Sequence, residues 1–422
     1  MVEVWLPYGS SQIPLRVPEE RLVEIFNIPE PAGVPDPLAE TRRLIDTNGR
    51  FQTQVKEAKR ICVSLGSCGN RQLAIDLVKT LHENLAQYSL APTTILCTKG
   101  APELDPNLFP ETRIEHHQPQ GSPTTPIENL NGDFPPQLNS EYMTSDLRII
   151  VGELKPHPYL QYSGLCDIVF PGLASEKSVQ SHLTRGAGFS MSDLRKERLQ
   201  ITTSAGDVFA LGMVLGSEGS PLQLAFGTLS DSMLTLGNAM QTACCRDVAK
   251  AADIVIMSVG GIPQDESLLE AIEIFPVGIE ALKRNGTLIV AAECGKGHGD
   301  TEFYQWCAEK REAHHLEARL RHHFNYNGSK AAFLRRTLVA HRIYFVSTIP
   351  DYYVENIFGM KAAPTVNAAL QTAQRVMGSQ STISVIPDAG RVILRQKPPA
   401  QQPGTSELQQ SAANGSEFRL PP

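Results

Sequence analysis

The sequence lacks any long uninterrupted run of apolar residues. Its longest runs, such as TLIVAAEC at 287–294, are short and interrupted, well below the ~20 residues that span a bilayer. The first residues, MVEVWLPYGSSQIP, contain neither the basic nor the apolar region of a signal peptide. We therefore expect no membrane partner and no secretion signal.

An excess of positive charge and a pattern of paired cysteines are also missing. Lys and Arg total 38 against 45 Asp and Glu, which gives a formal net charge of −7. This balance argues against a nucleic-acid partner, which usually requires a basic face. The eight cysteines are scattered, with no C-x-x-C pair and no zinc-ligand spacing. We expect reduced cysteines and a cytoplasmic protein.

Strand and helix patterns alternate along most of the 422 residues, which is enough chain for two or three domains. This alternation predicts an α/β protein with mainly parallel sheets. We expect two short strands within the first 20 residues, a β-rich stretch near 186–235 and one long helix at 301–323. The segment 396–422 is rich in Pro, Gln, Ser and Gly, and we predict that it is disordered.

Two glycine-rich loops follow predicted strands, where open α/β sheets bind ligands. Gly66 and Gly69 precede a helix that begins near Arg71, so this loop is suited to an anion, with Arg71 as a carboxylate or phosphate partner. Gly295 and Gly297 flank a lysine and suit contact with a phosphate or cofactor, although the loop is not a dinucleotide fingerprint. The alternative for both loops is an ordinary turn.

Histidines mark a third region. His157 stands between two prolines after the predicted strand 146–154, and a rigid turn of this kind suits a general base. His182 follows it and makes a site plausible, whereas a single histidine is more often a surface or core residue. A further group, His314, His315, His322 and His323, falls on the predicted helix 301–323, which we interpret as a solvated, charged helix.

The segment from Lys155 to Gly172, followed by His182, closely resembles the signature of the nickel-dependent lactate racemase (LarA) family. The motifs at 6–9, 252–265 and 286–294 also fit, in the same order. The resemblance extends to about residue 395. It implies two α/β domains with an active-site cleft between them, which we place at 1–240 and 241–395.

The resemblance also implies an activity. Members of this family carry a nickel pincer nucleotide, a nicotinate-derived mononucleotide tethered to a lysine, and they racemise or epimerise 2-hydroxy acids by hydride transfer to it. By position, His157 matches a catalytic histidine that moves the hydroxyl proton. His182 matches the nickel ligand, and Arg71 matches an arginine used toward the substrate. The implied partner is a small hydroxy acid, lactate-like or larger.

Several family positions are changed in this chain. Asp167 falls on the tethering lysine, Cys68 on an aspartate and Glu273 on a lysine that meets the substrate carboxylate. The second catalytic histidine is replaced in the stretch from Lys99 to Ala101. A negative charge at Glu273 would repel a carboxylate.

Three hypotheses remain open. In the first, the chain is a divergent racemase or epimerase that holds the pincer nucleotide without a tether. Alternatively, it has lost the cofactor and acts as a binding or regulatory protein. The third possibility is a different enzyme that holds a free nucleotide at the two glycine-rich loops.

Overall fold

The computed structural model describes residues 1–28, 31–128, 135–158, 160–186, 191–216, 219–309, 311–322 and 325–396. The predicted disordered tail, 396–422, lies outside these residues except for Gln396. The chain forms two compact α/β units. The N-unit contains residues 31–155 and 160–243, and the C-unit contains residues 1–28, 156–158 and 244–396. The chain therefore enters the C-unit for the last time near the predicted boundary at 240, while its first 28 residues also pack in that unit.

The N-unit is built on a six-stranded sheet in the order β13-β12-β9-β4-β5-β6, parallel except for β13. Its strands are β4 (Ile61–Leu65), β5 (Thr93–Cys97), β6 (Thr112–His116), β9 (Leu147–Glu153), β12 (Val208–Leu215) and β13 (Pro221–Thr228). Short strands are β7 (Thr124–Pro126), β8 (Gln137–Asn139) and β11 (Gln161–Ser163), whereas β10 (Lys155–His157) begins in the N-unit and continues into the C-unit. Every residue of β4 and β12 is buried, as in sheets covered on both faces.

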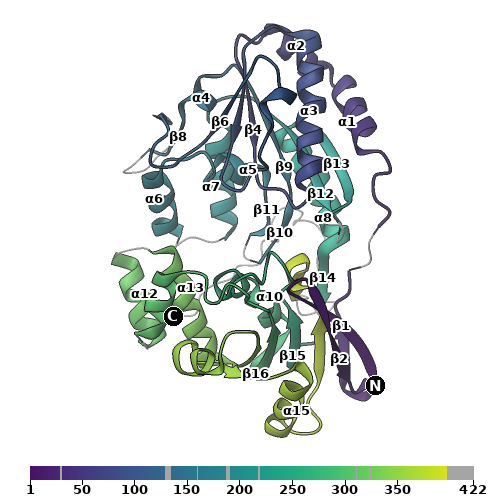
Figure 1. Ribbon diagram of the computed structural model, residues 1–422, viewed down its shortest axis with the longest axis vertical. Helices are drawn as coiled ribbons and strands as arrows, with labels where there is room; N and C mark the ends of the chain where they lie inside the picture. The colour runs from purple at the N-terminus through teal and green to yellow at the C-terminus, as the bar shows by residue number, and fades with distance from the viewer. Residues whose placement is uncertain are drawn as a thin grey trace, which may run out of the picture. The chain divides into compact units, whose positions relative to one another are not determined.

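Helices cover this sheet, and α1 and α3 lie side by side in Figure 1. The helices are α1 (Pro37–Asp46), α2 (Gly49–Glu57), α3 (Arg71–Tyr88), α4 (Ser140–Thr144), α5 (Leu165–Val169), α6 (Glu176–Gly186), α7 (Met191–Thr203) and α8 (Leu229–Cys244). Asn70 begins α3 by accepting a hydrogen bond from Leu73 N at 2.9 Å. The rings of Phe51, Phe209 and Phe226 form part of the core, with Phe51 edge-on to the other two.

The C-unit has a second six-stranded sheet, in the order β18-β17-β16-β15-β19-β3, and all of its strand pairs are parallel. Its strands are β3 (Leu22–Ile25), β15 (Ala252–Ser258), β16 (Leu282–Ala291), β17 (Arg342–Val346), β18 (Lys361–Ala362) and β19 (Ile383–Ile386). The predicted N-terminal strands are confirmed as an antiparallel hairpin, β1 (Val2–Tyr8) and β2 (Ser11–Val17). Strands β14 (Cys245–Val248) and β20 (Ile393–Gln396) form a separate parallel pair.

The helices of the C-unit correct one prediction. They are α9 (Leu268–Ala271), α10 (Phe275–Glu280), α11 (Thr301–Ala308), α12 (Ala313–His322), α13 (Tyr326–Ala340), α14 (Asp351–Tyr353) and α15 (Val366–Met377). The single helix predicted at 301–323 is thus wrong, because the structure divides it into α11 and α12. None of the helices in the described part of the chain has the length and apolar character needed to cross a membrane. The prediction of an α/β protein with mainly parallel sheets is confirmed.

The cysteines are all free thiols, and seven of the eight are buried. Burial raises the pKa of the thiols, for example that of Cys97 to about 11 and that of Cys62 to about 12. Since the thiolate is the reactive form, a disulfide reagent at pH 8 should modify at most the half-buried Cys245 in the native protein. All eight should react in denaturant, and rapid native modification of several thiols would contradict this burial.

Candidate functional site

The sheet of the N-unit changes direction between β4 and β9. From β4 the chain adds β5 and β6 on one side, and it then returns to place β9 on the other side. The carboxyl ends of β4 and β9 therefore flank a topological switch point, where open α/β sheets bind ligands. The predicted loop from Gly66 to Arg71 and the end of β9 at Glu153 lie at this point.

The loop after β4 already holds a carboxylate of its own chain. Gly69 N donates to Glu153 Oε2 at 2.8 Å. Gly66 has a packing role, because a Cβ on it would lie 2.4 Å from Cγ1 of Ile168 in α5. Arg71 is exposed at the start of α3. The predicted ligand contacts of Gly66, Gly69 and Arg71 remain predictions.

His182 lies in α6 and is enclosed by side chains. Its side chain is 1% exposed, and its ring packs edge-on against Phe170 with centroids 4.9 Å apart. Nδ1 lies 3.0 Å from Glu197 Oε2, and Nε2 lies 3.5 Å from Arg198 Nε. An arginine only donates hydrogen bonds, so Nε2 is the acceptor in its contact with Arg198 and Nδ1 carries the proton shared with Glu197.

Asp167, at the position of the tethering lysine, holds the arginine that faces His182. Its Oδ1 pairs with Arg198 Nη1 at 2.5 Å, and its Oδ2 accepts from Gly164 N at 2.7 Å. Both side chains are largely buried, at 24% and 16% exposure. Asp167, Arg198, His182 and Glu197 thus form one continuous polar chain across α5, α6 and α7.

A cavity of about 280 Å³ lies beside this chain of side chains. Its charged lining residues are Asp167, Lys196 and Arg198, and Tyr162 and Ser163 add hydroxyl groups. The rest of the lining is mostly apolar, from Leu154, Leu160, Leu165, Leu199 and Met233. Two cations against one carboxylate favour an anion, and the volume suits a small molecule.

A second cavity of about 280 Å³ is lined by Arg60, Glu111, Arg113 and Glu141, among others. It lies where β4, β5 and β6 begin, and thus at the amino ends of the strands. Ligands of open α/β sheets bind at the opposite ends. We therefore take the cavity beside Arg198 as the candidate site.

The residues present do not fit the tethered nickel nucleotide that the resemblance implies. Asp167 has no amine with which to form the tether. Metal-binding histidines commonly donate one N–H to a carboxylate, as His182 does to Glu197, and ligate through the other nitrogen. Here that other nitrogen faces the guanidinium of Arg198, and His182 is not among the residues that line the cavity. A fixed cation therefore stands where nickel is expected.

The other candidate histidine, His157, belongs to the C-unit. His157 lies half-buried in β10, close enough to Glu273 to influence its charge. Burial acts to raise the pKa of Glu273, but Lys330, Tyr326 and His157 together hold it below its usual range. Lys330 Nζ lies 2.5 Å from Glu273 Oε1, and the Tyr326 hydroxyl donates to the same oxygen. The negative charge predicted at Glu273 is thus paired with a lysine from α13.

The loop after β16 is stabilised by contacts within the C-unit. Gly297 N donates to Cys294 O at 2.8 Å, and Lys296 Nζ lies 2.5 Å from Glu266 Oε2. Gly297 has a φ of +69°, a conformation that favours glycine, and no atom lies within 4 Å of where its Cβ would be. Gly295 is similarly uncrowded. Ligand contact by Gly295 and Gly297 remains a prediction.

Three motifs that carry the resemblance meet within the C-unit. Asp265 is fully buried, and its Oδ2 accepts from Gly9 N at 2.7 Å and from Glu293 N at 3.0 Å. The turn of the β1–β2 hairpin is therefore attached to the loops that follow β15 and β16. Burial and nearby acidic groups raise the pKa of Tyr8 to about 12. These motifs thus have a structural role at the carboxyl ends of the strands.

Asp388, after β19, gives a testable dependence of stability on pH. Burial raises its pKa from 3.8 to about 6, although Arg391 opposes the shift. Because the folded pKa exceeds the unfolded one, ionisation of Asp388 destabilises the fold above pH 6 and not below pH 4. Asp388→Asn should therefore raise the free energy of unfolding at pH 8 by about 2 kcal/mol, with the gain disappearing by pH 4. Urea unfolding at both pH values checks this, and an equal effect at both would contradict it.

Comparisons with known proteins cover both units. Residues 8–187 match the model of the lactate racemase N-terminal domain, and residues 248–394 match that of the lactate racemase C-terminal domain. Lactate racemase of Thermoanaerobacterium thermosaccharolyticum is 26% identical, over 94% of this chain and all of the relative. Lactate racemase of Lactiplantibacillus plantarum is 25% identical, over 61% of this chain and 64% of the relative.

Solved structures share the fold. The lactate racemase apoprotein from T. thermosaccharolyticum superposes with a TM-score of 0.83 at 23% identity, covering 94% of this chain and all of that one. A protein from Thermotoga maritima gives a TM-score of 0.56 at 14% identity, covering 88% of this chain and all of that one.

Proposed function

Because the chain belongs to the lactate racemase family, as a distant member, we propose that it binds a small 2-hydroxy acid in the cavity beside Arg198. We further propose that it does so without a tethered nickel nucleotide. The observation that carries this proposal is the chain of contacts from Asp167 through Arg198 to His182.

The charges of the cavity support a carboxylate ligand. Arg198 has five N–H donors, and its contacts with Asp167 and His182 are made through Nη1 and Nε. Guanidinium groups bind carboxylates with charge-assisted hydrogen bonds, and Lys196 adds a second cation. The hydroxyl groups of Tyr162 and Ser163 are suited to the 2-hydroxyl of the ligand.

The apolar lining supports a ligand larger than lactate. Leucine and methionine side chains form most of the remaining wall, and covering them with an apolar group of the ligand favours binding, because it removes apolar surface from water. A 2-hydroxy acid with a branched aliphatic side chain combines the carboxylate, the hydroxyl and the apolar surface that this cavity complements. In this proposal Arg198 holds the carboxylate.

Calorimetric titration of the full chain tests the proposal. We expect 2-hydroxyisocaproate to bind more tightly than lactate, and isocaproate, which lacks the hydroxyl, to bind more weakly than 2-hydroxyisocaproate. Arg42 provides a control, because it is exposed on α1 and does not line the cavity, so Arg42→Ala should leave these affinities unchanged. Equal binding of all three acids, or none, would contradict the proposal.

Intact-mass and nickel analysis distinguish this function from racemisation. The protein should be co-expressed with the enzymes that synthesise the pincer nucleotide. We expect the mass of the unmodified polypeptide and no nickel that depends on His182. A nucleotide-sized adduct, or nickel that is lost in His182→Ala together with racemase activity, would overturn the proposal in favour of a pincer enzyme.

A further inference from the structure

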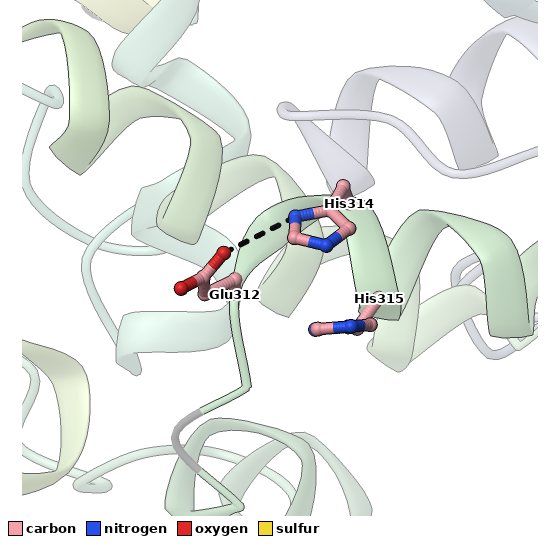
Figure 2. A group of neighbouring side chains, drawn as sticks. All are labelled: Glu312, His314 and His315. Atoms are coloured by element: carbon pink, nitrogen blue, oxygen red, sulfur yellow. Dashed lines mark ion pairs between the residues drawn. The ribbon is translucent and has the colours of Figure 1, made fainter.

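Three metal-ligating side chains meet at the start of α12, and two of them belong to the histidine group that the sequence predicts on a solvated helix. Glu312 precedes the helix, and His314 and His315 lie in its first turn. Figure 2 shows the carboxylate of Glu312 directed toward the ring of His314, with His315 beside it. Within the ranges that the structure describes, this is the one group of three such side chains whose ligand atoms all lie within 4.8 Å of one another.

We propose that Glu312, His314 and His315 bind one divalent transition-metal ion of the Zn²⁺ type. This inference does not depend on the proposed function, because all three residues belong to the C-unit and none lines the cavity beside Arg198.

The distances between the ligand atoms fit such an ion. His314 Nδ1 lies 3.3 Å from Glu312 Oε2. Two ligands held about 2.0–2.2 Å from a tetrahedral ion are about 3.3–3.6 Å apart, so the ion fits between these atoms with little movement. The rings of His314 and His315 have centroids 4.0 Å apart, which places a second imidazole next to the same position.

The ligand types select the class of ion. Two imidazoles and one carboxylate suit Zn²⁺, Ni²⁺ or Cu²⁺, whereas Mg²⁺ and Ca²⁺ prefer oxygen ligands alone. Three protein ligands leave one tetrahedral position for water. The carboxylate of Glu312 also offsets the partial positive charge at the start of α12, which would otherwise oppose a cation.

The exposure of the group makes the site accessible. The side chains of His314 and Glu312 are 66% and 78% exposed. A contact between two exposed polar side chains contributes little to stability, so the metal displaces only a weak interaction.

Zinc titration of the metal-stripped full chain, in competition with a chromogenic chelator, tests the proposal. We expect one equivalent of Zn²⁺ to bind, and its affinity to fall about tenfold or more in His314→Ala and in Glu312→Gln. His322→Ala is the matched control, because His322 is an exposed histidine at the other end of the same helix and should leave the affinity unchanged. Co²⁺ in place of Zn²⁺ should show the intense visible absorption of a tetrahedral site.

Two results would overturn the proposal: no saturable binding by the unmodified chain, or equal loss of affinity in His322→Ala. Binding that is lost in His182→Ala and retained in His314→Ala would also overturn it, and would place the ion in the N-unit instead. The nickel analysis of the proposed function should be repeated in a His314→Ala/His315→Ala variant. Nickel bound at the surface group is then not mistaken for nickel bound at His182, so each proposal can be contradicted without affecting the other.

Discussion

Replacing Arg198 with alanine should weaken the binding of 2-hydroxy acids by about 10- to 100-fold. A hydrogen bond to a charged group contributes about 1.5–3 kcal/mol, and each 1.4 kcal/mol corresponds to a factor of ten. The substitution also leaves Asp167 without its cation in a largely buried position, so the free energy of unfolding should fall by about 1–2 kcal/mol. Calorimetry with 2-hydroxyisocaproate and urea unfolding measure the two effects.

A double substitution separates binding from stability. Asp167→Ala/Arg198→Ala removes both members of the ion pair, so it should be more stable than Asp167→Ala or Arg198→Ala alone. Its affinity for the hydroxy acid should remain as low as that of Arg198→Ala. If the double variant regained affinity, Arg198 would have no direct contact with the ligand.

Gly164→Ala should destabilise the N-unit by about 3 kcal/mol or more. Gly164 has a φ of +149°, and an added Cβ would lie 2.1 Å from the backbone oxygen of Glu153. The atom that it would meet belongs to the backbone and not to the end of a flexible side chain, so β9 or the start of α5 must move. The strained backbone of an alanine at this φ lowers the free energy of unfolding further. Because α5 carries Asp167, binding of the hydroxy acid should weaken as well.

Gly297→Ala is the matched control for this prediction. Gly297 also has a positive φ, at +69°, but its added Cβ would meet no atom within 4 Å. It should therefore cost only the backbone preference, about 1 kcal/mol. The urea midpoints of the two variants measure the difference, and equal losses would show that the approach to Glu153 is not tight.

The alternation of strands and helices was predictable because it depends on local periodicity, whereas the failures arose from contacts between distant segments. The sequence from 301 to 323 contains no strong helix breaker, yet the chain turns back between α11 and α12. The Arg319 guanidinium lies 4.1 Å from the centre of the Trp306 ring, and its Nη1 lies 2.9 Å from Glu309 Oε1. A continuous helix would separate these residues.

The prediction of a β-rich stretch near 186–235 was wrong in part for the same reason, because contacts between distant segments outweigh local preference. Its β-branched residues Ile201, Thr202 and Thr203 favour a strand, but they end the helix α7. Ile201 and Thr202 are fully buried, and Thr202 Oγ1 donates to the carbonyl of Arg198 at 2.8 Å. Burial against the rest of the N-unit thus outweighs the local preference. The strands β12 and β13 in the same stretch agree with the prediction.

The sequence identified the positions of His182 and Asp167 through the family motif, and it missed their partners. Arg198 and Glu197 belong to no motif, and Lys330 lies on a different helix from Glu273. Ion pairs between separate elements leave no pattern in a single sequence, because either member alone is an ordinary charged residue. Only the folded chain shows that Arg198 stands at the position expected for the metal.

The placement of residues 1–28 in the C-unit has a consequence for how the chain folds during its synthesis. The β1–β2 hairpin and β3 leave the ribosome before the N-unit, but β19, the neighbour of β3, follows the N-unit in the chain. Domains generally fold as they emerge, so the N-unit folds before the other strands of the C-unit sheet have been made, while residues 1–28 are still unpaired with them. A fragment that starts at Cys244 would expose β19 as an unpaired edge, which is a template for aggregation. Joining residues 1–28 to the end of that fragment, at Gln396, would supply the missing edge strand and yield a C-unit that can be studied alone.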